Sequence, residues 1–228
     1  MNRAIIIMTK VPIAGTVKTR LHSILSPEEC AELAAAFLQD TVGKAQTVHS
    51  KKIIAFSPSD KRDELEAVLP SEHFLIAQNG ADLGEKMFNA FQFAFERNSD
   101  AVVMIGTDSP TFPADYIEQA FDCLENADAV LGKTTDGGFY LIGFRHRLQK
   151  EIFENVEWSS ARTFRQTKEN ITRLNFNLQE IPSWFDVDEP EDLHKLFAEF
   201  QTDKRARKIA PETFRWLTNQ KIFSKPND

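Results

Sequence analysis

The chain has 228 residues, of which 42% are hydrophobic and 27% are charged. This composition is that of a globular protein long enough for one domain. The formal net charge of −7 excludes a general electrostatic attraction to nucleic acid or to an anionic membrane. The apolar run at residues 4–8 is followed by Lys10, so it is too short for a signal peptide or a membrane span. We therefore expect a cytoplasmic protein with neither nucleic acid nor membrane as a partner.

Short apolar segments alternate with segments of helical periodicity along the chain. The strands are predicted at residues 4–8, 52–56, 73–77, 101–105, 128–131, 139–144 and 173–181. The helices are predicted from Ser26, at 59–69, from Asp82, from Pro113, and at 158–171, 189–200 and 211–219. The fully apolar segment 101–105 is typical of a central parallel strand. The alternation predicts an α/β fold with a mainly parallel sheet and helices on both faces.

Two stretches are expected to be connections, namely the Gly-rich residues 132–138 and the charged residues 204–208. We expect one domain over residues 1–228, with a core at about 4–200 and a helical appendage at about 205–228. Cys30 and Cys123 lie within apolar helical patterns and have no Cys or His at metal-ligand spacing. Buried, reduced thiols are therefore expected at both positions.

A basic loop follows the first predicted strand, where a parallel sheet binds its ligands. Lys10, Lys18 and Arg20 surround Gly15, which allows a close approach of the backbone. Three cations around such a turn suit a pyrophosphate. The loop lacks the Gly-Lys-Ser/Thr ending of a Walker loop, and its single Gly excludes a dinucleotide fingerprint. The alternative is a solvated surface loop.

Acidic residues follow two other predicted strands. Asp108 comes directly after residues 101–105, where a carboxylate can bind Mg²⁺ or Mn²⁺ or can simply begin a turn. Asp186 and Asp188 are two residues apart, so on an extended segment they share a face and could bind one ion. Asp188 is also a candidate N-cap of the helix that follows it. These three residues are the predicted metal ligands.

Glycines and aspartates at two further loops suggest contacts with the ligand. Gly137 and Gly138 precede a strand and could let the backbone lie against a sugar or a base, or could form a tight turn. Asp82 begins a helix whose N-terminus could face an anion, although an ordinary N-cap is the alternative. Asp136, beside the glycine pair, is a candidate base for an acceptor hydroxyl.

Six segments taken together resemble the GT-A-like nucleotide-diphospho-sugar transferase superfamily. They are residues 10–21 (KVPIAGTVKTRL), 80–87 (GADLGEKM), 105–110 (IGTDSP), 136–143 (DGGFYLIG), 158–160 (WSS) and 186–193 (DVDEPEDL). The resemblance is greatest to the bacterial glycosyltransferase group associated with radical-SAM enzymes and arsenosugars, which is related to phospholactate guanylyltransferases. It extends over residues 4–200.

The resemblance implies a three-layer α/β/α fold with a mixed, mainly parallel sheet. It implies that Lys18 and Arg20 bind phosphate, that Gly15 forms the turn of the loop, and that Asp136 and Gly137 border the sugar or acceptor. It also implies Mg²⁺ or Mn²⁺ at the segment of Asp108. This segment reads Thr-Asp-Ser and departs from the Asp-x-Asp pattern of the superfamily.

The expected reaction is the transfer of a sugar from a nucleoside diphosphate sugar to a small-molecule acceptor. Lys18, Arg20 and the metal would stabilise the leaving diphosphate, and Asp136 would act as the base. The first alternative is nucleotidyl transfer from an NTP with release of pyrophosphate. The second is a non-catalytic module that binds nucleotides. The Phe-bearing C-terminal segment could cover the core or a second copy of the chain, so a homodimer stays an open expectation.

Overall fold

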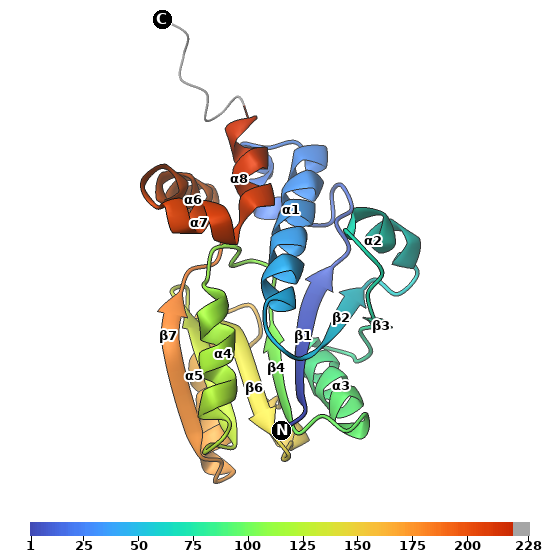
Figure 1. Cartoon of the computed structure of the whole chain (residues 1–228), viewed down its shortest axis with the longest axis vertical. Coiled ribbons are helices and arrows are strands. Elements are labelled where there is room, and N and C mark those ends of the chain that lie inside the picture. Colours follow the sequence, from blue (N-terminus) through green and yellow to red (C-terminus); the bar gives the residue numbers. More distant parts are fainter. Residues whose placement is uncertain (221–228) are drawn as a thin grey trace, which may run out of the picture.

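The computed structural model describes residues 1–220, and these form a sheet with helices on both faces (Figure 1). The strands are β1 (Arg3–Lys10), β2 (Lys51–Ser57), β3 (Leu75–Ala77), β4 (Ala101–Ile105), β5 (Ala129–Thr134), β6 (Phe139–Arg145) and β7 (Leu178–Trp184). The α-helices are α1 (Pro27–Gln46), α2 (Arg62–Val68), α3 (Leu83–Glu96), α4 (Ala114–Cys123), α5 (Thr163–Arg173), α6 (Pro190–Thr202), α7 (Lys204–Ile209) and α8 (Pro211–Thr218). Two short 3₁₀ helices are η1 (Thr19–Ser23) and η2 (Lys150–Ile152).

The seven strands of the sheet have the order β3-β2-β1-β4-β6-β5-β7. β6 is antiparallel to both of its neighbours, β4 and β5, and the other pairings are parallel. The predicted mixed, mainly parallel sheet is therefore confirmed. As a consequence of this topology, β1, β4 and β7 end at the same edge at which β6 begins, and loops from all four strands meet there.

The core lies on both faces of the sheet because alternate residues of a strand point to opposite sides. Ile5 and Ile7 of β1 pack with residues of α1 and α4, which lie in front of the sheet in Figure 1. Ile6 packs on the other face with residues of α3 and α5. The predicted start of α1 at Ser26 is confirmed by a capping box, in which Ser26 Oγ accepts from Glu29 N and Glu29 Oε2 accepts from Ser26 N.

The helices after β7 form a third apolar cluster with α1 and η1 at the end of the molecule where β1 and β7 terminate (Figure 1). The contact is also polar, because the carboxylate of Asp40 in α1 accepts hydrogen bonds from Glu212 N at 2.9 Å and from Thr213 N at 2.8 Å. Asp40 thus satisfies free N–H groups in the first turn of α8. Residues 221–228 of the expected appendage lie outside the described residues.

Some expected boundaries were wrong, and the physical reasons are visible. Residues 204–208, expected as a connection, belong to α7, whose first turn is capped by the Asp203 side chain. Gly132, expected in a loop, lies in β5 and pairs with Leu141 of β6. A Cβ atom there would lie 2.6 Å from the Tyr140 ring, so the glycine marks a close approach within the sheet and not a turn. The predicted helix at 158–171 starts only at Thr163 and ends at Arg173, so the predicted strand at 173–181 starts later, at Leu178.

Both cysteines are free thiols: Cys30 is buried and Cys123 is partly buried. Burial raises the pKa of each thiol, which disfavours the reactive thiolate. Within residues 1–220, no helix combines the length and the apolar character that crossing a lipid bilayer requires.

Candidate active site

A cleft of about 600 Å³ opens at the edge of the sheet where β1, β4 and β7 end. Its walls come from the basic loop, the β4–α4 connection, the segment after β7, the turn before β6, the first turns of α3 and the segment before α5. The charged and polar lining includes Lys10, Lys18, Arg20, Gln78, Lys86, Asp108, Asp136, Asp186 and Asp188. The predicted basic and acidic loops, with the exceptions given below, therefore meet in one place.

Lys18 lies between two of the predicted metal ligands. Its ammonium donates to Asp108 Oδ1, to Asp188 Oδ1 at 3.0 Å and to the backbone oxygen of Val187 at 2.7 Å. The side chain is only 6% exposed. Its backbone is left-handed, with φ 48°, a conformation that is uncommon outside glycine.

Burial acts to lower the pKa of Lys18, but the charges and hydrogen bonds of Asp108 and Asp188 outweigh it and raise the pKa above the usual value. Lys18 is therefore a firmly charged counter-ion of two carboxylates. Lys18 was expected to bind phosphate. In the structure its ammonium instead donates its hydrogen bonds to Asp108, Asp188 and the backbone oxygen of Val187.

Asp186 is the carboxylate of the cluster without such a cation. Burial raises its pKa to about 7, and the charges of Asp136, Asp188 and Asp108 add to the effect. Burial also acts to raise the pKa of Asp188, but Lys18 outweighs it and the pKa is lowered. The alternating placement of Asp186 and Asp188 on one face is as expected, since both line the cleft while Val187 between them is fully buried.

Asp188 does not cap α6. The N-cap is Glu189, which forms a capping box with Asp192. Asp192 Oδ2 accepts from the backbone N–H groups of Glu189 at 3.0 Å and of Asp188 at 3.3 Å. The carboxylate of Asp188 is thereby free to bind Lys18, and the expected alternative role of Asp188 was wrong.

Asp136 has one engaged oxygen and one free oxygen. Asp136 Oδ1 accepts from Thr134 Oγ1 at 2.5 Å and from Gly138 N at 2.9 Å. Oδ2 accepts no hydrogen bond from the described residues. Two hydrogen bonds to one oxygen fix the orientation of the carboxylate, so that the second oxygen is available to the cleft, which Asp136 lines.

Two of the expected binding residues contact the protein itself. Gly137 has φ +98°, and a Cβ atom there would lie 2.3 Å from the backbone oxygen of Ala161, so its close approach is to the segment before α5. Asp82 is the N-cap of α3 and accepts from Glu85 N at 2.8 Å, and it is absent from the lining of the cleft. The N-cap alternative for Asp82 is confirmed.

The other expected residues of the basic loop, Gly15, Lys10 and Arg20, differ in their surroundings. Gly15, with φ +79°, forms a turn whose Cβ position meets open space. Lys10 and Arg20 line the cleft. Arg20 is paired with Glu189 at 3.4 Å, while Lys10 has no carboxylate within 4.0 Å among the described residues.

Sequence reasoning missed cleft residues that follow β3 and precede α5. Lys86 in the second turn of α3 lines the cleft and forms no ion pair within residues 1–220. Gln78 lines it and donates to the backbone oxygens of Thr9 and Ala55, which ties the end of β3 to β1 and β2. Trp158 borders the opposite wall. The signal was present for Lys86 and Trp158, since both lie in the segments that carry the family resemblance.

The carboxylates of the cleft suit a divalent cation only if the phosphate oxygens of a bound nucleotide complete its coordination. No cluster of three or more His, Cys, Asp or Glu residues within residues 1–220 is arranged to hold a metal. Carboxylate oxygens are nevertheless the donors that Mg²⁺ and Mn²⁺ prefer, and such ions often take one or two of them together with phosphate oxygens. Asp186 and Asp108 fit this role, because both line the cleft. Asp186 is partly buried beside the negative charges of Asp136, Asp188 and Asp108, and both effects raise its pKa.

Comparison with known proteins identifies the family of the chain. Residues 40–160 match the model of the family DUF2064, described as "Uncharacterized protein conserved in bacteria". The chain is 28% identical over 188 residues to 2-phospho-L-lactate guanylyltransferase from Haloarcula marismortui, an alignment that covers 82% of this chain and 83% of the relative.

Solved structures share the whole fold. A proposed nucleotide-diphospho-sugar transferase from Desulfovibrio desulfuricans G20 is 32% identical, with a TM-score of 0.88 over 96% of this chain and 95% of the other. Rv0371c from Mycobacterium tuberculosis H37Rv, solved in complex with manganese, is 12% identical, with a TM-score of 0.53 over 86% and 97% of the two chains. At that identity the likeness is one of fold alone.

Proposed function

The chain belongs to the DUF2064 family and is a transferase of the nucleotide-diphospho-sugar transferase fold, and from this premise we propose that it transfers a sugar from a nucleoside diphosphate sugar to a small acceptor hydroxyl. The observation that carries the proposal is Asp136, whose Oδ1 is fixed by two hydrogen bonds and whose Oδ2 is free at the cleft. A hydroxyl acceptor needs a base, whereas an acceptor phosphate does not.

The donor diphosphate would bind at the cationic side of the cleft. Lys10 and Lys86 have no ion-pair partner among the described residues, and Arg20 is paired only with the half-exposed Glu189. These groups would stabilise the charge that develops on the departing diphosphate. Lys18 contributes indirectly, by holding Asp108 and Asp188 in place.

Asp186 and Asp108 would bind a divalent cation together with the diphosphate. The ion, when bound, offsets negative charge on the leaving group. Asp186 would lose its proton on binding it, since a ligating carboxylate must be ionised. The oxygen of the acceptor hydroxyl would attack the anomeric carbon of the sugar, and the bond between that carbon and the diphosphate would break. Asp136 Oδ2 would take the proton of the hydroxyl.

A second candidate is nucleotidyl transfer, in which an acceptor phosphate attacks an NTP and pyrophosphate leaves. It is favoured by the guanylyltransferase relative, whose alignment covers 82% of this chain. The same cations and carboxylates could serve this reaction, because both reactions expel a phosphate-bearing group. Asp136 would then have no proton to accept.

The products of the reaction separate these candidates. The protein is incubated with a panel of nucleoside diphosphate sugars and small polyols, or with a panel of NTPs and small phosphate monoesters, in the presence of Mg²⁺ or Mn²⁺. Glycosyl transfer releases nucleoside diphosphate and is slowed at least tenfold in Asp136→Asn. Release of pyrophosphate from an NTP, unaffected by Asp136→Asn, would instead establish the second candidate. No release from either panel, together with no thermal stabilisation by any nucleotide, would contradict both.

A further inference from the structure

A lysine buried in α1 contacts the connection that carries Asp108. The Nζ atom of Lys44 donates to the backbone oxygen of Pro110 at 2.9 Å and lies 3.5 Å from that of Ser109. The ring centroid of Phe112 is also 3.5 Å from this nitrogen. Three contacts of one ammonium thus fall within residues 109–112, immediately after Asp108.

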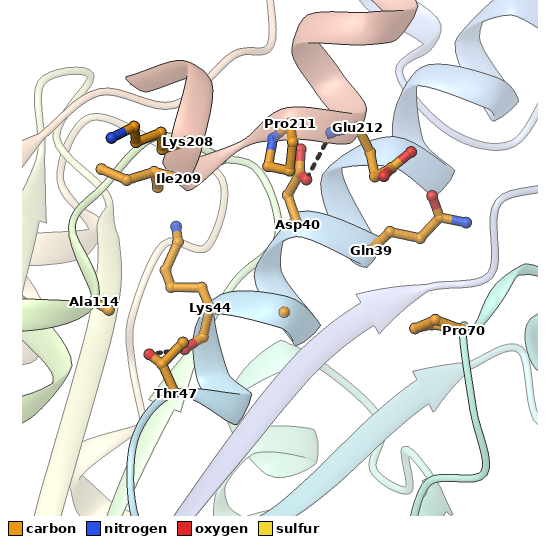
Figure 2. A pocket seen from close by; sticks show the side chains of 11 residues that line it. Gln39, Asp40, Lys44, Thr47, Pro70, Ala114, Lys208, Ile209, Pro211 and Glu212 are labelled. Carbon is orange, nitrogen blue, oxygen red and sulfur yellow. Dashed lines mark hydrogen bonds between the residues drawn. The ribbon is translucent and has the colours of Figure 1, made fainter. Parts of the chain in front are cut away.

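Lys44 is only 5% exposed. It lines a cavity of about 590 Å³ between α1, the start of α4 and the turn from α7 to α8, and Figure 2 shows its ammonium pointing toward Lys208 and Ile209. No carboxylate lies within 4.0 Å of its nitrogen in residues 1–220, and burial lowers its pKa well below the usual value. The charges of Asp40 and Glu199 act against this effect from a greater distance. Among the described residues, the direct hydrogen bonds of the ammonium go to the β4–α4 connection, and they offset part of the cost of its burial.

The same connection is fixed from its other side by β7 and the segment after it. Val187 N donates to the backbone oxygen of Asp108 at 2.9 Å. Trp184 Nε1 donates to Thr111 Oγ1 at 3.2 Å. The β4–α4 connection is therefore held between α1 and β7, and Lys44 is the polar contact that α1 makes with its backbone. Pro110 O receives no other hydrogen bond from the described residues.

We propose that Lys44 is a positioning residue that fixes the β4–α4 connection so that the Asp108 carboxylate meets a divalent cation and nucleotide in the cleft. The inference rests on the proposed function, in which Asp108 is a ligand of the divalent cation. Lys44 itself touches neither ligand. Groups that orient a ligating side chain from behind typically contribute 10- to 100-fold to metal affinity.

The matched control is Lys52, which also donates to two backbone oxygens, those of Val48 at 2.6 Å and Ser50 at 2.8 Å. It lies in β2 near the opposite end of the sheet from the cleft. Lys44→Met and Lys52→Met each remove an ammonium that binds two carbonyl groups and keep much of the side-chain volume. Only the first removes a contact with the β4–α4 connection, and Lys44→Arg restores a cation with several donors.

Binding of MnCl₂ is measured by calorimetry and electron paramagnetic resonance, alone and with GDP, together with deuterium uptake by peptides that contain residues 106–112. We expect Lys44→Met to bind Mn²⁺ about tenfold more weakly and to exchange these amides about tenfold faster. Lys44→Arg should recover part of both effects. Lys52→Met should match the wild type in both measurements.

Unchanged deuterium uptake in folded Lys44→Met would overturn the proposal, as would Mn²⁺ affinity within twofold of a wild type that binds Mn²⁺. A wild type that binds no Mn²⁺ with or without GDP would contradict the assignment of a cation, and with it the metal part of the proposed function. The exchange measurement would then still decide whether Lys44 holds the connection.

Discussion

The ammonium of Lys18 donates a hydrogen bond of 3.0 Å to the carboxylate of Asp188, which lies 170 residues further along the chain. The same nitrogen binds Asp108 on a third segment. One lysine therefore joins the loops that follow β1, β4 and β7. The Lys18 ammonium therefore lies between Asp108 and Asp188, where the sequence predicted only a metal ion.

Lys18→Met should destabilise the protein, because Asp108 and Asp188 would lose their shared cation. Removing one partner of a buried pair costs about 3–5 kcal/mol. The carboxylate side chains are 52% and 39% exposed, so solvent screening reduces the expected loss to about 1–2 kcal/mol. Urea denaturation would measure it. The control is Lys10→Met, which removes an exposed cation with no ion pair among the described residues and should change stability by less than about 0.5 kcal/mol.

The same variant has a second expected property. Without Lys18, the repulsion between Asp108 and Asp188 is offset by any cation that enters the cluster. Mn²⁺ should therefore raise the melting temperature of Lys18→Met more than that of the wild type. An equal or smaller rise would show that the lysine and the metal do not share this negative charge.

The raised pKa of Asp186 makes the stability of the metal-free protein depend on pH. The folded carboxyl holds its proton up to a pH of about 7, whereas the unfolded one loses it near its ordinary pKa of 3.8. The folded state thus binds more protons between these values, and the free energy of unfolding falls as the pH rises through this window. Partial exposure limits the expected loss to about 1 kcal/mol.

Asp186→Asn removes the titration and should flatten this part of the stability profile, which is measured by denaturation from pH 4.5 to 8. Mn²⁺ should bind the wild type more tightly as the pH rises through about 7, with release of a proton that calorimetry in buffers of different ionisation enthalpy detects. A slope that persists in Asp186→Asn would assign the titration to another group.

The sequence predicted which segments approach the cleft, but it did not predict how their side chains pair. The order of strands and helices followed from local periodicity, and β4 was predicted at its exact bounds. The partner of Lys18 was not predictable in this way, because Asp108 and Asp188 are 90 and 170 residues away and the loop pattern suits phosphate equally well. Pairing across the sheet depends on tertiary geometry, which local spacing does not contain.

The wrong boundary at α7 and the contact of Gly137 with the chain itself have similar causes. Residues 204–208 are charged along their length, and a helix forms there because Asp203 caps it and Ala206 packs into the cluster with α1 and α6. Gly137 was expected to approach a sugar, yet a close approach to a ligand and one to the chain itself require the same residue type. Only the position of Ala161 distinguishes them.

Two glycines with positive φ allow a matched test of this second point. Gly137→Ala would place a Cβ 2.3 Å from the oxygen of Ala161, whereas Gly15→Ala meets open space. Both variants bear backbone strain of about 1 kcal/mol, and overpacking adds about 1–3 kcal/mol at Gly137 alone. Urea denaturation should therefore rank Gly137→Ala as the less stable. Equal losses would mean that the segment before α5 moves away at little cost.

Arg20 and Glu189 give opposite predictions for the binding of a diphosphate. Arg20 lines the cleft and is 3.4 Å from Glu189, which competes with any anion for the guanidinium. Arg20→Gln should weaken the binding of GDP about tenfold. A charge-assisted hydrogen bond contributes about 1.5–3 kcal/mol, and the existing ion pair with Glu189 reduces the net gain that Arg20 makes on binding the phosphate.

Glu189→Gln removes the competitor and keeps an oxygen that can accept hydrogen bonds at the N-cap of α6, so it should tighten the binding of GDP two- to threefold without loss of stability. Calorimetry at low and at moderate salt measures both variants, and the salt dependence of binding should be smaller for Arg20→Gln. If both variants weaken binding, Glu189 positions Arg20 for the phosphate. If neither changes it, the diphosphate does not contact this end of the loop, and Lys10 and Lys86 are left as the cations to test next.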